Sequence, residues 1–355
     1  MGAFDAPQDE DCLSLNVWAP PGDGHPVLVF VHGGGFTSGS GGLAWYDGAE
    51  LAAFGDLVVV TVNYRLGVPG FLRLPGVSEG NLGLLDLLAA LRWVRDNIAA
   101  FGGDPGAVTA CGQSAGAQSI LALMSAPRAA GLFHRAILQS TPAGMSPDPP
   151  AAATRTGLLL LNELHATSPA EVPLRGEPVD ALARVPVGEL LAAQQRVAGR
   201  TAVPLSPVPP FQLVADGDLV AADLVGAVGG GVPVLMGTTR DEASAFIPGD
   251  RDAAALVTER MFAGPGRRLA EELTRKGAPA WTYRFDWHPP RSPYGACHCV
   301  ELPFVLGSAA AWREAPMLDG DPPPDLVRRV RRAWTGFARD GDPGWPRETV
   351  HHFTG

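Results

Sequence analysis

Ser114 lies between two glycines in the stretch TACGQSAGAQS (109–119), at the spacing G-x-S-x-G that is found around many nucleophilic serines. An apolar run, AVTACG (107–112), predicts a strand leading into the serine, and AGAQSILALMS (115–125) predicts a helix after it. A sharp turn between strand and helix lifts a serine hydroxyl above a sheet, and the amides that begin the helix favour developing negative charge. The alternative is a glycine-rich structural turn, which would not need this order of elements.

A serine hydroxyl is a weak nucleophile and needs a base, which directs attention to the eight histidines. His288 in FDWHPP and His298 in GACHCVELPF both follow the serine far along the chain. Hydrolases with this turn have the chain order serine, acid, histidine, so both are possible bases by position. His298 lies in a glycine-containing loop, which suits a side chain that reaches back over a sheet. His32 precedes three glycines and is predicted to be structural.

The acid that orients the base should follow a strand between the serine and the histidine. The stretch VPVLMGTTRDEASAF (232–246) offers Asp241 and Glu242 directly after a buried strand. Either carboxylate could hold the imidazole in one tautomer and stabilise the imidazolium that forms during the reaction. From the residues alone, the choice between the two acids stays open, and each could instead be a solvated loop acid.

The glycine run in VHGGGF (31–36) follows another buried strand. Glycines let backbone N–H groups face an incoming oxygen with no Cβ in the way. Esterases and lipases build an oxyanion hole from such a run together with the amide after the nucleophile. A phosphate-binding loop is the rival explanation, but the G-K-[ST] element of that loop is absent.

The rest of the chain alternates apolar strand patterns with helical patterns, which predicts an α/β fold with a mostly parallel sheet. A region rich in Ala, Pro and Gly, residues 142–230, is predicted to be an insertion that covers the sheet within a single domain spanning 1–355. The predicted strands are 26–35, 56–65, 107–112, 133–140, 232–238 and 280–287, and the predicted helices are 81–103, 115–125, 154–165, 187–198 and 324–341.

Composition excludes several classes of protein. A hydrophobic content of 46% with 18% charged residues indicates a compact chain, and a net charge of −10 argues against nucleic-acid binding. The basic run RRVRRAW (328–334) is predicted to be a solvated helix face. No apolar run is long enough to span a membrane, and the start MGAFDAPQDEDC does not look like a signal peptide, so a cytoplasmic location is expected. The cluster Cys297-His298-Cys299 is disfavoured as a zinc site, because no second cluster completes four ligands.

Taken together, these stretches resemble the type B carboxylesterase family, the group that includes the cholinesterases. They run in family order over almost the whole chain. The matching segments are EDCLSLNVWAP (10–20), PVLVFVHGGGFTSGS (26–40), VVVTVNYRLGVPGFL (58–72), GNLGLLD…ALRWVRDNIAAFGGDPGAVTACGQSAGA (80–117), FHRAILQS (133–140), VPVLMGTTRDEASAF (232–246), GACHCVELPFVLG (295–307) and WTGFARDGDPGWP (334–346).

The resemblance implies an α/β-hydrolase fold and a Ser-Glu-His triad. It gives Ser114 as the nucleophile, Glu242 as the acid and His298 as the base, because ELPF follows His298 as in the family. The amides of the oxyanion hole would come from Gly34, Gly35 and Ala115. The resemblance further implies a structural ion pair between Arg65 and Asp86, and a serine, Ser140, close behind the site.

Some features depart from the family. Leu87 stands where glutamine is usual, and Thr141 stands where glycine is common. The family has a longer segment before residue 10, so we expect Cys12 to be a free thiol and the strand around Leu13–Trp18 to lie at an open sheet edge. The segment after Phe246 is also shorter, which is expected to remove part of the cover over the site.

The sequence therefore predicts a serine carboxylesterase that acts on a small-molecule ester without a metal or a cofactor. Three alternatives remain at this point. The chain could be a binding protein on the same scaffold, since fold does not determine function. It could be a shortened, weakly active relative, or it could hydrolyse amides, lactones or thioesters with the same triad.

Overall fold

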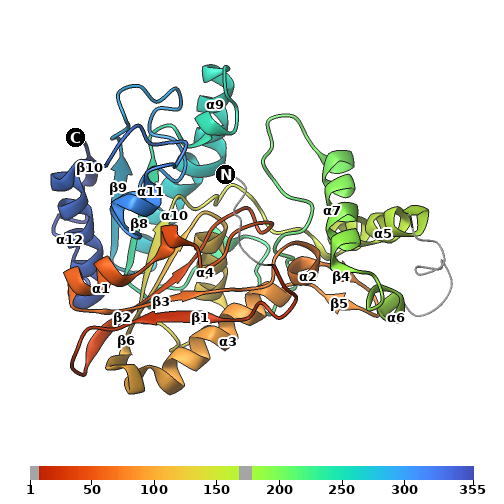
Figure 1. The fold of residues 1–355 in the computed structure, drawn as a ribbon, viewed down its shortest axis with the longest axis horizontal. Helices are drawn as coiled ribbons and strands as arrows, with labels where there is room; N and C mark the ends of the chain where they lie inside the picture. Colours follow the sequence, from red (N-terminus) through yellow and green to blue (C-terminus); the bar gives the residue numbers. More distant parts are fainter. Residues whose placement is uncertain (1–7, 168–177) are drawn as a thin grey trace.

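The computed structural model describes residues 8–167 and 178–355. Within them, a central sheet of eight strands has the order β1-β3-β2-β6-β7-β8-β9-β10, with helices on both faces (Figure 1). Strand β1 is antiparallel to β3, and the other neighbouring pairs are parallel, which confirms the predicted fold class. The strands are β1 (Leu15–Trp18), β2 (His25–Val31), β3 (Val58–Val62), β6 (Gly103–Gln113), β7 (Arg135–Gln139), β8 (Val234–Thr239), β9 (Ala280–Phe285) and β10 (Val350–Phe353), with a separate hairpin of β4 (Arg73–Leu74) and β5 (Ser78–Glu79).

The helices connect these strands and cover the sheet. They are α1 (Ala49–Gly55), α2 (Gly67–Phe71), α3 (Leu82–Asn97), α4 (Ala115–Ser125), α5 (Pro150–Thr167), α6 (Pro178–Leu182), α7 (Val187–Thr201), α8 (Leu224–Ala227), α9 (Arg251–Val257), α10 (Gly264–Arg275), α11 (Ala309–Trp312) and α12 (Pro324–Asp340). Short 3-10 turns occupy Ala44–Tyr46, Ile98–Phe101, Pro127–Ala129, Glu242–Ala245 and Leu302–Phe304, and a π-helical turn occupies Thr258–Ala263.

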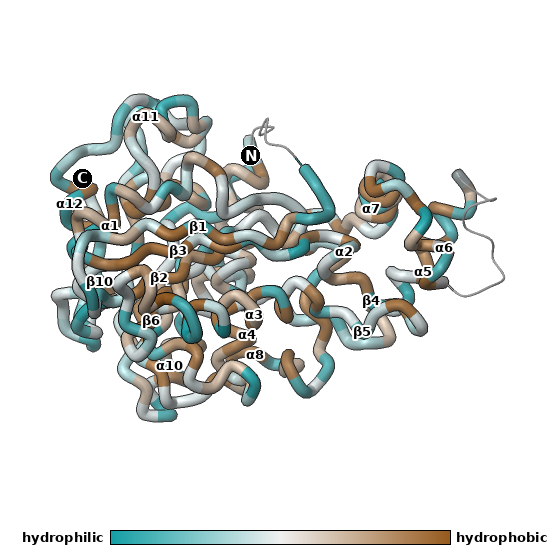
Figure 2. Tube along the Cα trace, turned by 60° about the horizontal axis from the view of Figure 1, so that its bottom comes forward, coloured by the Kyte–Doolittle hydropathy of each residue, from teal (hydrophilic) through white to brown (hydrophobic). Residues whose placement is uncertain are grey.

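Strand β2 shows why helices are needed on both faces of the sheet. Its side chains alternate between two buried clusters, because successive residues of a strand point to opposite faces. Val27, Val29 and Val31 belong to the cluster formed with α3 and α4, whereas Leu28 and Phe30 belong to the cluster formed with α1 and α12. Strands β2 and β3 are accordingly hydrophobic along their length (Figure 2).

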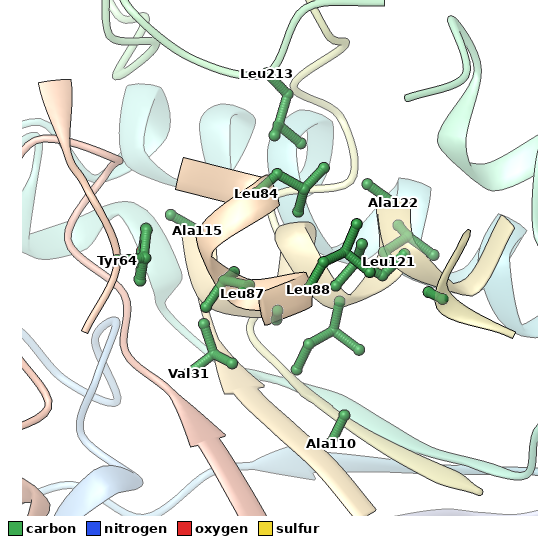
Figure 3. Close-up of a cluster of buried hydrophobic side chains, with 14 of the residues drawn as sticks. Val31, Tyr64, Leu84, Leu87, Leu88, Ala110, Ala115, Leu121, Ala122 and Leu213 are labelled. Atoms are coloured by element: carbon green, nitrogen blue, oxygen red, sulfur yellow. The ribbon is translucent and has the colours of Figure 1, made fainter. Parts of the chain in front are cut away.

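Helix α3 buries one face, with leucines spaced three and four residues apart. Leu84, Leu87 and Leu88 share a buried cluster with Leu121 of α4, and Leu88 lies beside Leu121 (Figure 3). Burial of a leucine side chain contributes about 2 kcal/mol, so this cluster helps to hold both helices in place. The predicted helix 81–103 ends earlier than expected. A 3-10 turn follows α3, and Gly102, at φ 79°, ends that turn in the left-handed conformation.

The segment 142–230 divides into two parts, and its residues 168–177 lie outside the described residues. Helices α5 and α7 pack against each other and reach beyond the end of the sheet (Figure 1). Glu163 of α5 forms ion pairs with Arg196 and Arg200 of α7. Further along, Leu213 and Val220 are buried in the core with α3 and α4. The description of this segment as an insertion within one domain stays a prediction.

The basic run at 328–334 is only partly a solvated face. It lies in α12, where Arg331 is buried and donates hydrogen bonds to the Glu50 carboxylate and the Gly307 carbonyl oxygen. The prediction was wrong for this residue because a run of charges does not reveal which one faces the protein. Every helix in the described part of the chain is too short or too polar to cross a membrane.

Arg65 and Asp86 form the ion pair that the resemblance implied. Arg65 donates from Nε and Nη2 to the two carboxylate oxygens of Asp86, at 2.8 and 2.7 Å, and its backbone N–H donates to the same carboxylate. The side chain of Asp86 is 6% exposed and that of Arg65 is 34% exposed. This two-point contact joins α3 to the loop after β3.

We expect Asp86→Ala to lower the free energy of unfolding by about 2 to 3 kcal/mol, because it leaves a partly buried guanidinium and a backbone N–H without their acceptor. Thermal and urea unfolding would measure the loss. Asp96→Ala is the matched control, since Asp96 also pairs with an arginine on α3 but is exposed, and it should leave stability nearly unchanged. Equal losses in the two variants would contradict a structural role for the Arg65–Asp86 pair.

Candidate active site

Ser114 occupies a strained turn between β6 and α4. Its backbone angles are φ 55° and ψ −122°, a conformation that residues with a Cβ rarely adopt. The turn closes tightly, because a Cβ on Gly116 would lie 2.2 Å from the Val31 carbonyl oxygen, and one on Gly112 would lie 2.7 Å from the Ala117 nitrogen. The two glycines of the motif are therefore required by packing.

Glu242 and His298 are in direct contact. The Nδ1 atom of His298 lies 2.5 Å from Oε2 of Glu242, and both side chains are buried. The other oxygen of Glu242 accepts a hydrogen bond of 2.8 Å from the Thr239 backbone N–H. An ionised carboxylate accepts only, so the neutral imidazole carries its proton on Nδ1 and presents a lone pair on Nε2.

The two residues that the sequence left as alternatives lie elsewhere. Asp241 forms an ion pair with Arg240, and its carboxylate accepts a hydrogen bond of 2.9 Å from the Ala296 backbone N–H. His288 forms a hydrogen bond through Nδ1 to the Pro289 carbonyl oxygen and lines a different cavity. The structure brings Glu242 to His298 and leaves Asp241 and His288 outside this contact.

The surroundings of His298 act on its pKa in opposite directions. Burial favours the neutral ring, but the charge and the hydrogen bond of Glu242 outweigh it and raise the pKa of His298 above its usual value. The rings of Phe246 and Phe262 lie 5.3 and 5.2 Å from the imidazole centroid. Glu301 is a second buried carboxyl, and burial together with the charge of Glu242 raises its pKa to about 7.

One cavity of about 450 Å³ contains the predicted nucleophile, base and oxyanion hole. Its lining residues include Ser114, His298, Gly34, Gly35 and Ala115. Gly34 and Gly35 have φ 119° and 61°, and a Cβ on Gly34 would lie 2.0 Å from the Ser38 carbonyl oxygen. A side chain at Gly34 would therefore disrupt the loop that carries the predicted oxyanion hole.

The rest of the cavity wall is largely apolar. Among the described residues that line it, none is Asp, Glu, Lys or Arg. The apolar lining comes from several separate segments of the chain, namely Trp45, Pro142, Met145, Pro207, Pro209, Ala245, Phe246, Met261, Phe262, Pro316 and Met317. Such a wall suits an uncharged group and offers an ionic one no oppositely charged side chain.

Gln113 is a contact of His298 that the sequence analysis did not find. Its amide nitrogen lies 3.1 Å from Nε2 of His298 and 3.3 Å from Sγ of Cys299. Among the described residues, no hydrogen bond joins Nε2 of His298 to the Ser114 hydroxyl. The only signal in the sequence was the position of Gln113 directly before the nucleophile.

Ser140 directly follows β7, beside the end of β6. It is buried with φ 50°, and its backbone N–H donates to the Gly237 carbonyl oxygen. Within the described residues, all four cysteines are free thiols. In the cluster considered for zinc, His298 binds Glu242 through Nδ1, and Cys299 accepts from Gln113.

Comparison with known proteins gives the family. The Carboxylesterase family profile matches residues 1–255 and 250–352. The chain belongs to this family. It is 40% identical to a probable N-octanoylanthranilate hydrolase of Rhodococcus erythropolis, over 96% of this chain and 79% of that protein. It is 36% identical to the para-nitrobenzyl esterase of Bacillus subtilis, over 96% of this chain and 77% of that protein.

A solved structure of a PNB esterase agrees with this carboxylesterase at a TM-score of 0.85 and 35% identity, covering 95% of this chain and 76% of that one. The α/β-hydrolase fold and the identification as a carboxylic-ester hydrolase follow from these matches. The family match breaks near residue 250, close to where the sequence indicated a segment shorter than in the family.

Glu242→Gln should reduce kcat/KM for ester hydrolysis roughly 1,000-fold, because an amide cannot stabilise the imidazolium or hold the tautomer as a carboxylate does. The remaining activity should also change its pH dependence. The carboxylate raises the pKa of His298, so its loss should move the acidic limb of the profile to lower pH.

Asp241→Asn is the control, since it removes the adjacent carboxylate without touching His298. It should change kcat/KM by no more than about threefold, in line with a residue outside the site. A pH–rate profile of both variants measures the difference, and equal effects would argue against Glu242 as the acid.

Proposed function

We propose that this carboxylesterase hydrolyses its substrate through an acyl-enzyme on Ser114, with His298 as general base and Glu242 as the acid that orients it. The observation that carries this proposal is the buried contact between Glu242 and His298, whose imidazole lines the cavity that contains Ser114. The strained turn at Ser114 supports it, because a non-glycine residue in that conformation is typical of an exposed nucleophile.

In the first half of the reaction, Nε2 of neutral His298 takes the proton as Ser114 Oγ attacks the ester carbonyl carbon. The negative oxygen of the tetrahedral intermediate would accept hydrogen bonds from the N–H groups of Gly34, Gly35 and Ala115. His298 then gives its proton to the leaving alcohol, and Ser114 stays acylated. Water repeats the sequence on the acyl-enzyme and releases the acid.

The proposed substrate class is an uncharged ester with apolar acyl and alcohol groups. The cavity of about 450 Å³ offers no charged side chain to pair with an ionic substrate. The names of the two relatives refer to an octanoyl group, which is apolar, and to a nitrobenzyl group, which is uncharged. The anthranilate in the first name is joined to the octanoyl group by an amide and carries a carboxylate, so that name supports only the apolar acyl group.

The nucleophile can be tested directly with a fluorophosphonate probe. We expect mass spectrometry of the labelled protein to find the probe on Ser114, and p-nitrophenyl butyrate to be hydrolysed. Ser114→Ala should lose labelling and turnover while its circular dichroism and melting temperature stay near wild type. Labelling of another serine, or turnover by Ser114→Ala, would overturn the assignment.

The substrate class can be tested with a pair of esters of similar size. p-Nitrophenyl butyrate should have a kcat/KM at least about 100-fold higher than the p-nitrophenyl monoester of succinate, because the succinate carboxylate would lose hydration without gaining a cationic partner. Equal values for the two esters would contradict the proposed class, but not the proposed mechanism.

A further inference from the structure

The side chain of Gln113 is 1% exposed and lies at the end of β6, between the nucleophile and the base. Its amide is held on more than one side. The nitrogen faces His298 and Cys299, and a Cβ built on Gly33 would lie 2.4 Å from the amide oxygen. Little space is left for the amide to take another position while Gly33 and the loop of His298 stay in place.

The partner of Nδ1 determines the direction of the hydrogen bond at Nε2. Because Nδ1 of His298 donates to Glu242, Nε2 of the neutral ring is an acceptor. The Gln113 amide nitrogen has two N–H groups, and each has one acceptor, the Nε2 lone pair at 3.1 Å and the Cys299 sulfur at 3.3 Å. The lone pair that must receive the Ser114 proton is therefore occupied in this arrangement.

This bond favours the neutral base. An N–H that donates to Nε2 stabilises the unprotonated ring, whereas in the imidazolium the Nε2–H would face another N–H. The other ionisable groups around the ring are the carboxyls of Glu242 and Glu301, which favour the charged ring, and the neighbouring thiols Cys297 and Cys299. Among these neighbours, Gln113 is the group whose hydrogen bond opposes Glu242.

We propose that Gln113 is a positioning residue that holds His298 in its neutral, Nδ1-protonated form and yields the Nε2 lone pair to Ser114 when the ester binds. The proposal rests on the proposed function, because it assigns a task only if His298 is the base. Under this proposal, Gln113 acts on His298 through Nε2, whereas Glu242 acts on it through Nδ1.

The test is the pH profile of kcat/KM for p-nitrophenyl butyrate in Gln113→Met and Gln113→Glu. The position of its acidic limb is compared with that of the wild type. Methionine keeps the length of the side chain but cannot donate, so the limb should move up by about half a pH unit. Glutamate keeps the shape and adds a carboxylate that can accept from the imidazolium, so the limb should move up by about one unit or more. At a pH on the limb, one unit corresponds to about tenfold in rate.

Gln118→Met is the matched control. Gln118 is another buried glutamine near the nucleophile, but its amide donates to the Met145 carbonyl oxygen and does not touch His298. Its limb should coincide with that of the wild type. Circular dichroism and melting temperature would show that each variant is folded, and the isosteric Gln113→Glu carries the test if Gln113→Met does not fold.

The proposal is overturned if the limb stays in place or moves down in the folded Gln113 variants, or if Gln118→Met shifts it equally. A general loosening of the site would change the rates, but it would not shift the acidic limb in the Gln113 variants alone. Failure of the proposed function looks different, because fluorophosphonate would then not label Ser114 in the wild-type enzyme.

Discussion

The site depends on the close approach of the first turn of α4 to the end of β2. A Cβ at Gly116 would lie 2.2 Å from the Val31 carbonyl oxygen and 2.6 Å from that of His32, so only glycine permits this distance. The contact brings the start of a helix, with its free N–H groups, beside the glycine run that follows β2. Ser114, Ala115 and Gly35 consequently line one cavity, although β3, α2 and α3 separate β2 from β6 in the chain.

The cavity at Ser114 and the buried space behind His298 differ in charge. The cavity wall is uncharged, and behind His298 lie two buried carboxyls, Glu242 and Glu301. Burial, together with the charge of Glu242, raises the pKa of Glu301 to about 7. Glu301 accepts a hydrogen bond from Gln139, which in turn accepts one from Trp334 of α12. The site is thereby joined to the helix layer on the far side of the sheet.

Local patterns predicted much of this fold and site. The strand before Ser114 and the helix after it could be read from a few adjacent residues, because apolar runs and glycine positions are local signals. The choice between Asp241 and Glu242 could not be made from the residues alone. The two are adjacent in one turn, and only the tertiary structure decides which carboxylate points to His298.

Gln113 and Arg331 show, in different ways, that contacts between residues distant in sequence could not be predicted from local patterns. Gln113 belongs to no residue class that suggests catalysis, and its importance comes from a partner 185 positions away. Arg331 lies in a run of charges, and its burial depends on Glu50 at the start of α1. The strand β10, with the sequence VHHF, has no apolar run and was not predicted; it forms by pairing with β9. Contacts distant in sequence therefore account for most of what the sequence did not reveal.

A second cavity, of about 1180 Å³, lies next to the cavity that contains Ser114. It is lined by residues of α9 and α10, close to the break in the family match. Phe262 and Tyr294 line both cavities, so one layer of side chains separates them. Phe262 also packs on the imidazole of His298 and is 2% exposed. The shape of the cavity at Ser114 and the packing of His298 therefore depend on the same side chain, which the π-helical turn before α10 holds in place.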